Sequence, residues 1–199
     1  MKKREKEEAN IRSYLCSLPI DTWIVFTDGS CPKNPGTAGI GVVLFYPPST
    51  PIISPRRMLG FVDHKFEHPG SIPTDSGEIH ELSAPIGIGT NNIAELKAIE
   101  YAIDAITARL SLPNIPPPSM IRILTDSKYA IGVLSKNWNI HENVTLIHQI
   151  RVKYNALVRH VRNCEFKHVL GHSKVAGNER ADKLAAIAAR RNPSPTVTR

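Results

Sequence analysis

Two short apolar runs, each followed directly by an aspartate, constrain the fold of this chain more than any other feature of its sequence. Residues 23–27 and 121–125 are rich in β-branched and other large apolar side chains, and both runs are too short for a stable helix. Asp28 follows the first run, where a Gly-Ser pair indicates a loop, and Asp126 follows the second. Because functional groups converge at the carboxyl ends of parallel strands, we expect Asp28 and Asp126 at one edge of a sheet.

Helical and strand patterns alternate in the second half of the chain. Apolar residues recur at helical spacing over residues 96–110, with Asn92 predicted as the N-cap and Glu95 in the first turn. The other predicted helices cover residues 129–134, residues 147–161 and a last segment from an N-cap at Asn178 to about residue 191. The other predicted strands cover residues 40–46, 58–62, 81–88 and 165–169. This order predicts a mixed sheet whose later strands are joined through helices.

The length and composition suit one folded domain. The chain has 199 residues, of which 41% are hydrophobic, and this is enough for one substantial core but leaves little room for two. We predict a polar N-terminal lead-in over residues 1–20, a single domain over residues 21–191 and a flexible tail over residues 192–199. Residues 47–89 form a long insert rich in Pro, Gly and Ser, which we interpret as tolerated length.

Basic charge is concentrated in the C-terminal third of the chain. From Arg151 onward there are eleven Lys and Arg against three Asp and Glu, a balance of +8, so the remainder carries −1 of the total charge of +7. Lys and Arg that neutralise phosphates release counterions, so this distribution fits a polyanionic partner. A purely solubilising role fits the basic charge equally well, and charge alone does not decide between the two.

The sequence lacks the usual signals for membrane insertion or secretion. No apolar run approaches the roughly 20 residues that a membrane-spanning helix requires. The first ten residues mix Lys and Arg with Glu, and no apolar stretch follows them, unlike a secretory signal. Three cysteines without metal-ligand spacing, Cys16, Cys31 and Cys164, suggest reduced thiols. We therefore expect an intracellular protein (cytoplasmic, or nuclear or organellar in a eukaryote) and, in the absence of heptads or long apolar edges, a monomer.

Two further acids join the aspartates that follow the predicted strands. Glu95 stands beside the neutral pair Asn91-Asn92, and Asp182 lies in the first turns of the last predicted helix. An isolated acid at such a place is usually a turn, cap or helix-dipole residue, and only the four contexts together indicate a common site. Carboxylates gathered at one edge need a cation between them, and Mg²⁺ suits carboxylates, phosphates and retained waters. Two such ions about 3.5–4 Å apart can activate water and stabilise the leaving oxygen in phosphodiester cleavage.

Four motifs that contain these acids resemble, in order, the motifs of the type 1 ribonuclease H family. They are Thr27-Asp28-Gly29-Ser30-Cys31 with Asn34-Pro35-Gly36, then Thr90-Asn91-Asn92-Ile93-Ala94-Glu95-Leu96, then Leu124-Thr125-Asp126-Ser127, then Gly171-His172 with Gly177-Asn178-Glu179-Arg180-Ala181-Asp182. They extend from residue 26 to about residue 186, most of the chain. One short motif is weak evidence, whereas four in the family's order identify the chain as a member.

The resemblance implies the fold, the reaction and the roles of particular residues. The fold is α/β and ribonuclease H-like, with a mixed five-stranded sheet whose first three strands are antiparallel and later strands parallel, flanked by helices. The reaction is hydrolysis of the RNA strand of RNA–DNA hybrids, leaving 5′-phosphate and 3′-hydroxyl ends. The implied catalytic residues are Asp28, Glu95, Asp126, His172 and Asp182. The four acids match the family's metal ligands for two Mg²⁺ ions, which Mn²⁺ can replace, with Asp28 expected to bridge both ions. His172 matches a mobile histidine that helps proton transfer or product release.

Recognition of RNA in a hybrid depends on the 2′-hydroxyl, which neutral amides and backbone N–H groups can contact. By resemblance, the residues that grip the RNA strand are Gly29, Ser30, Asn34, Asn91 and Asn92. The Asn-Pro-Gly segment at residues 34–36 also fits simple turn chemistry, and one segment can serve both purposes. Well-known bacterial members carry a basic, Trp-containing protrusion, which is shortened here to residues 136–141.

Two other functions are compatible with the sequence. The first is a ribonuclease H domain of a retroelement reverse transcriptase. The initial Met and the lack of adjoining polymerase sequence favour a free-standing enzyme over that alternative. The second is a non-catalytic family member that binds nucleic acid, and the presence of all four carboxylates and of His172 favours an enzyme.

Overall fold

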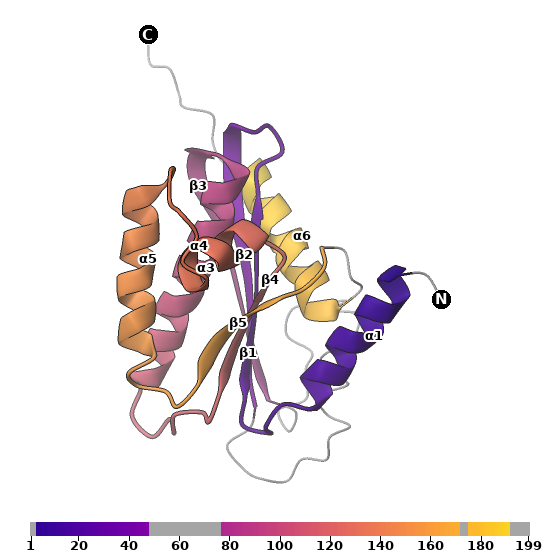
Figure 1. Ribbon diagram of the computed structural model, residues 1–199, viewed down its shortest axis with the longest axis vertical. Coiled ribbons are helices and arrows are strands. Elements are labelled where there is room, and N and C mark those ends of the chain that lie inside the picture. The colour runs from indigo at the N-terminus through magenta and orange to yellow at the C-terminus, as the bar shows by residue number, and fades with distance from the viewer. Residues whose placement is uncertain (1–2, 48–76, 172–174, 192–199) are drawn as a thin grey trace.

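The two apolar runs that end in aspartates form adjacent inner strands of a five-stranded sheet (Figure 1). The computed structural model describes residues 3–47, 77–171 and 175–191. The strands, in the spatial order β3-β2-β1-β4-β5, are β1 (Trp23–Ser30), β2 (Gly36–Tyr46), β3 (Glu78–Gly89), β4 (Ile121–Thr125) and β5 (Cys164–His168). β1, β2 and β3 pair antiparallel, whereas β4 runs parallel to β1 and β5 parallel to β4. The expected mixed sheet is confirmed.

Helices cover both faces of this sheet (Figure 1). In the described part of the chain they are α1 (Lys3–Cys16), α3 (Asn91–Leu110), α4 (Lys128–Ser135), α5 (Val144–Leu157) and α6 (Ala176–Arg190). Buried side chains of α3, α4 and α5 form a core on one face, and those of α1 and α6 form a second core on the other. The three-layer arrangement follows from a sheet that is apolar on both sides and must be covered on both.

Alternation along β1 explains how one strand contributes to both cores. Successive side chains of a strand point to opposite faces. Trp23 and Val25 therefore join the core under α3, α4 and α5, and Ile24 and Phe26 join the core under α1 and α6. All four side chains are buried, which accounts for the continuous apolar run in the sequence.

Two predicted boundaries at the carboxyl end of β1 and the start of α3 are wrong. β1 continues through Asp28 as far as Ser30, because residues 28–30 pair with residues 39–41 of β2. Asp28 is therefore held in a strand and not in a loop. Thr90, and not Asn92, caps α3, because the Thr90 side chain accepts a hydrogen bond from the N–H of Ile93. Glu95 consequently lies in the second turn of α3.

The start of the last helix also differs from the prediction. α6 begins at Ala176, after Val175, so Asn178 lies inside the helix and does not cap it. Its side chain is buried, at 3% exposed. The predicted strand at residues 58–62, the tail at residues 192–199 and His172 lie outside the described residues. The strand predicted at residues 81–88 is present and longer, since β3 begins at Glu78.

The N-terminal lead-in is a helix that packs on the sheet. Ile11 and Leu15, four residues apart on α1, are buried in the core that also contains Ile24 and Phe26. Residues at this spacing share one face of a helix. The ammonium group of Lys167 on β5 lies over the ring of Tyr14, with 4.4 Å between Nζ and the ring centroid. α1 is thus part of the folded core.

Over residues 3–47, 77–171 and 175–191, no helix has the length and apolar character needed to cross a lipid bilayer. Cys16, Cys31 and Cys164 are free thiols, and the last two are buried.

Candidate active site

The register of β1 and β4 places Asp28 and Asp126 side by side. The last residues paired between these parallel strands are Thr27 and Thr125. Each aspartate is the next residue along its strand, so both reach the same edge of the sheet. The two threonines also fix this edge: Thr27 Oγ1 donates to the carbonyl of Leu124 at 3.4 Å, and Thr125 Oγ1 accepts from the N–H of Ser127 at 3.1 Å. The predicted meeting of the two aspartates is confirmed.

Glu95 reaches this edge because α3 lies unusually close to β1. A Cβ atom on Gly29 would lie 2.3 Å from the backbone nitrogen of Glu95 and 2.8 Å from the Cβ of Ala94. Real Cβ atoms do not approach other atoms so closely, so only glycine allows this contact. The ligand oxygens of Asp28, Glu95 and Asp126 lie within 4.8 Å of one another.

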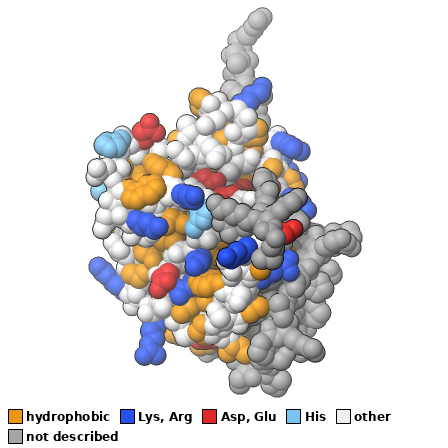
Figure 2. Space-filling view, turned by 45° about the vertical axis from the view of Figure 1, so that its right-hand side comes forward, with side chains coloured by type: hydrophobic (Ala, Val, Ile, Leu, Met, Phe, Trp, Pro, Cys, Tyr) orange, Lys and Arg blue, Asp and Glu red, His pale blue; other side chains and the backbone are white. Residues whose placement is uncertain are grey.

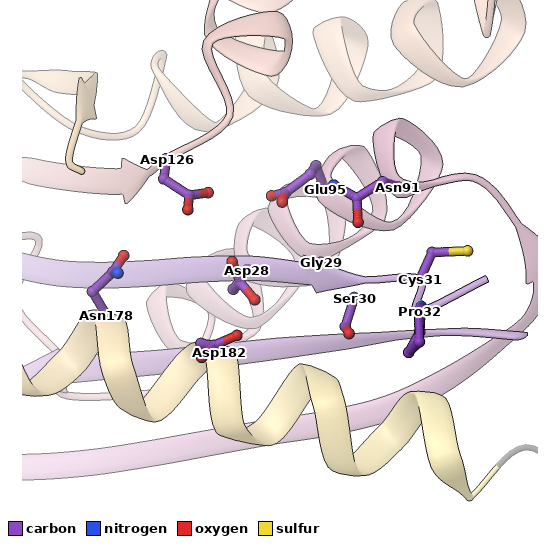
Figure 3. A pocket seen from close by; sticks show the side chains of 10 residues that line it. All are labelled: Asp28, Gly29, Ser30, Cys31, Pro32, Asn91, Glu95, Asp126, Asn178 and Asp182. Carbon is purple, nitrogen blue, oxygen red and sulfur yellow. The ribbon is translucent and has the colours of Figure 1, made fainter. Parts of the chain in front are cut away.

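Asp182 comes to the site from the opposite face of the sheet, on α6. A Cβ atom on Gly41 would lie 2.0 Å from the carbonyl oxygen of Ala181, so the glycine lets α6 pack directly on β2. Arg180 fixes the helix to β3 through a bidentate ion pair with Glu81, at 2.8 and 2.7 Å. Asp182 is thereby oriented toward Asp28 from below in Figure 3.

The four acids line one cavity of about 260 Å³ (Figure 3). Asp28 lies near its centre, with Glu95 and Asp126 on one side and the α6 residues on the other. The complete lining is Asp28, Gly29, Ser30, Cys31, Pro32, Asn91, Glu95, Asp126, Asn178 and Asp182. Acids are the only ionisable groups in this lining apart from the Cys31 thiol, so the cavity favours bound cations.

Burial and mutual repulsion hold protons on the inner acids in the absence of a cation. Burial, followed by the charges of Asp126 and Asp182, raises the pKa of Asp28 to about 8. Burial, followed by the charge of Asp28, also raises the pKa of Glu95 well above its ordinary range, although a backbone hydrogen bond from Gly29 opposes the shift. Ionising both groups together is therefore costly unless a positive charge enters the cavity.

One atom in the cavity is poised for such a cation. Oε2 of Glu95 is buried and has no hydrogen-bond partner within the described structure. A buried carboxylate oxygen without a partner is unfavourable, and a divalent cation would supply the missing partner. With three carboxylates within 4.8 Å and Asp182 opposite them, the donor set fits hard divalent metal ions.

The predicted substrate-binding residues divide into three groups. Gly29, Ser30 and Asn91 line the cavity beside the acids. Asn34 supports them from outside the lining, because its Oδ1 accepts a hydrogen bond from the N–H of Asn91 at 3.1 Å. Asn92 is partly buried next to Asn91 but is not in the cavity wall.

Three cavity residues were not predicted. Asn178 is four residues before Asp182 on α6, and this helical spacing was a usable signal that both side chains face the same way. Cys31 and Pro32 extend the wall beyond Ser30 (Figure 3). For these two residues the sequence offers only adjacency to the first motif.

Comparison with known proteins agrees with this geometry. The RNase H family profile matches residues 21–190. Ribonuclease H of Thermosynechococcus vestitus is 29% identical over 178 residues, which cover 85% of this chain and 89% of that protein. Ribonuclease HI of Synechocystis sp. is 26% identical over 181 residues, with 85% and 89% covered. The crystal structure of LC11-RNase H1 in complex with RNA/DNA hybrid shares the fold, with a TM-score of 0.56, 24% identity, and 86% of this chain and 99% of that chain covered. Because the profile spans most of the sequence and its acids meet in one cavity, this chain belongs to the RNase H family and is a type 1 ribonuclease H.

Proposed function

We propose that this ribonuclease H hydrolyses the RNA strand of RNA–DNA hybrids with two Mg²⁺ ions, leaving 5′-phosphate and 3′-hydroxyl ends. The observation that carries the proposal is the convergence of Asp28, Glu95 and Asp126 within 4.8 Å, with Asp182 across the same cavity. The catalytic domain comprises residues 21–191, and Mn²⁺ can replace Mg²⁺. The complex of LC11-RNase H1 with an RNA/DNA hybrid supports the choice of substrate.

The acids have distinct places in this site. Asp28 lies between the Glu95–Asp126 side and the Asp182 side of the cavity, so its carboxylate would help to hold cations on both sides (Figure 3). The unpartnered Oε2 of Glu95 points to a ligand position for one of them. When bound, the ions activate a water and stabilise the leaving oxygen. Because the pKa of Asp28 is raised to about 8, its carboxyl group would release a proton when it holds a cation near neutral pH.

We assign the selection of RNA to the uncharged residues in the cavity wall. Gly29, Ser30 and Asn91 stand next to the acids, where backbone N–H, hydroxyl and amide groups can pair with a 2′-hydroxyl. Asn34 contributes by holding the first residue of α3 in place through its bond to the N–H of Asn91. Asn92 belongs to the same neutral segment and is assigned to RNA contact by its motif alone. His172 is assigned to proton transfer or product release on the same ground.

The free thiols support an intracellular setting. Two of the three free thiols, Cys31 and Cys164, are buried, and Cys31 lines the proposed site. An intracellular, reducing compartment keeps such thiols unmodified. We assign the protein to an intracellular compartment on this basis.

The test is cleavage of an end-labelled RNA–DNA hybrid, compared with RNA–RNA and DNA–DNA duplexes, in Mg²⁺. We expect cutting of the RNA in the hybrid alone, suppression by chelator, and loss of activity in Asp28→Asn. Asp104→Asn is the matched control, because Asp104 lies on α3 in an ion pair with Lys153, outside the cavity lining. It should cut at the wild-type rate.

The outcomes separate the candidate functions. Hybrid binding without any cutting by the wild-type protein would overturn the enzymatic proposal and leave a binding protein. Equal cutting of RNA–RNA duplex would show that the uncharged residues in the cavity wall do not select the hybrid. Activity that survives in Asp28→Asn would remove Asp28 from the metal site.

A further inference from the structure

A second cavity, of about 310 Å³, lies where α1 meets the carboxyl end of β5. We name it the α1–β5 pocket. Its walls come from α1, from the start of α4 and from the end of β5 and the residues after it. The lining is Asn10, Ile11, Tyr14, Lys128, Lys167, His168, Val169 and Leu170.

α1 forms one wall of this pocket and is fixed in place. Ile11 and Leu15 are buried in the core shared with α6. Tyr14 supports Lys167 directly, because the ammonium Nζ lies 4.4 Å from the centroid of the Tyr14 ring. A cation held over an aromatic face is attracted to the ring and keeps a defined position. The pocket therefore has a basic side chain, Lys167, placed over an aromatic ring, and the buried side chain of Ile11 in its wall.

The chemistry of the lining selects anions. Lys128 and Lys167 are positively charged and exposed, His168 stands beside Lys167, and none of the eight lining residues is an acid. The catalytic cavity has the opposite composition, with four acids and no Lys or Arg. This pair of neighbouring cavities suits a ligand that is anionic along its length. Metal ions held by the acids would attract one part of such a ligand, and the ammonium groups of the lysines would attract the next part.

The α1–β5 pocket is contiguous with the catalytic edge. Lys128 is two residues after Asp126, at the start of α4. The segment after β5 runs alongside the end of β4, since the N–H of Val169 donates to the carbonyl of Thr125 at 3.0 Å. Figure 2 shows an acidic patch bordered by Lys, Arg and His side chains on this side of the molecule.

We propose that the α1–β5 pocket binds the phosphodiester backbone of the nucleic-acid substrate beyond the scissile position, through Lys128 and Lys167. Phosphate contacts of this kind position a nucleic acid without reading its sequence. α1 lies outside residues 21–190, the part of the chain that matches the family. The wall of the pocket that α1 forms is therefore an addition to the family domain. This inference rests on the proposed function only in that the bound polyanion is taken to be the enzyme's own substrate.

The test measures binding and turnover separately in Lys128→Ala, Lys167→Ala and the double variant. Binding of a fluorescent hybrid is followed by anisotropy in Ca²⁺, and steady-state cleavage is followed in Mg²⁺, each at several salt concentrations. We expect each single variant to raise Kd and KM about fivefold at low salt, as for the loss of one exposed charge pair, with kcat unchanged. The slope of log Kobs against log salt should become shallower by about 1 for each lysine removed.

Two further variants keep the test decisive. Arg162→Ala removes one positive charge outside the pocket, because Arg162 precedes the start of β5 and His168 is at the other end of that strand. This variant should leave Kd, KM and the salt slope at wild-type values. Asn10→Asp places a negative charge in the α1 wall without removing any core contact, and should weaken hybrid binding about fivefold through repulsion of phosphate.

Failure of this inference can be distinguished from failure of the proposed function. Wild-type cleavage of the hybrid, with all three lysine variants binding as tightly and with the same salt slope as wild type, would overturn the assignment of the α1–β5 pocket and leave the enzymatic proposal intact. A fall in kcat at unchanged Kd would also overturn it, because the lysines would then act on the chemical step. A wild-type protein that cuts no hybrid would refute the proposed function, and the anisotropy series would still report on the pocket.

Discussion

Gly29 on β1 lies directly against Glu95 on α3, so that a Cβ atom at position 29 would be 2.3 Å from the backbone nitrogen of Glu95. Gly29 follows Asp28 in the strand, and the N–H of Gly29 donates to the Glu95 carboxylate. One close approach between a strand and a helix thus sets the separation of two of the four acids that line the cavity. The glycine of the first motif has a packing role as well as any role in substrate contact.

We expect Gly29→Ala to separate β1 from α3, to lower the free energy of unfolding by about 1–3 kcal/mol and to reduce cleavage strongly. Urea unfolding and hybrid cleavage measure the two effects. Gly89→Ala is the control, because a Cβ there would make only ordinary contact with Ile93, at 3.5 Å. Wild-type activity in Gly29→Ala would mean that the site tolerates a displaced α3.

We expect Asp28→Asn to be more stable than the wild-type protein in chelator, by about 5 °C in Tm near pH 8. The pKa of Asp28 is raised from 3.8 to about 8, so the folded protein retains a proton that the unfolded chain has released. Wild-type stability therefore falls as pH rises between about 4 and 8, and asparagine avoids this loss. Calorimetry at a series of pH values tests the prediction, and the two proteins should converge toward pH 4. A constant difference across that range would contradict it.

We expect Mg²⁺ affinity to rise with pH up to about 8, by up to about tenfold per pH unit where one proton is displaced per ion. The reason is again the raised pKa of Asp28, since the metal-bound form needs the ionised carboxylate. Titration calorimetry in buffers of different ionisation enthalpy should detect proton release at pH 7. Equal Mg²⁺ affinity at pH 6 and pH 8 would show that the acids are ionised before the metal arrives.

We expect Leu15→Ala to destabilise the protein by about 2–5 kcal/mol, the usual cost of truncating a buried leucine. Leu15 is fully buried on α1, against the core of α6 and the sheet. Ser13→Ala on the exposed side of the same helix should be nearly neutral. Thermal unfolding of both variants compares them directly. Equal stability of the two variants would mean that α1 is dispensable for the fold.

Most helices and strands, and the four acids to which we assign catalysis, could be predicted from the order of the amino acids alone. Two short apolar runs specified β1 and β4. A short, continuous apolar run is typical of a parallel strand that is buried on both faces of a sheet. Helical periodicity specified α3 and α6, but the predicted N-caps are wrong by two residues for α3 and by three for α6. Capping depends on local geometry that several neighbouring residues could supply, as Thr90 and Asn92 both could for α3. The order of the four motifs then predicted the family.

How these residues act together depends on contacts between elements that are far apart in the sequence. The raised pKa of Asp28 depends on burial and on the charges of Asp126 and Asp182, which are distant in sequence. The packing of α1 against β5 likewise joins residues that are far apart in the sequence, Tyr14 and Lys167. Sequence periodicity specifies which face of an element is apolar, but separations between elements arise only when glycines such as Gly29 let particular helices approach particular strands. The acids could therefore be read from the sequence, whereas their electrostatic coupling and the neighbouring basic pocket could not.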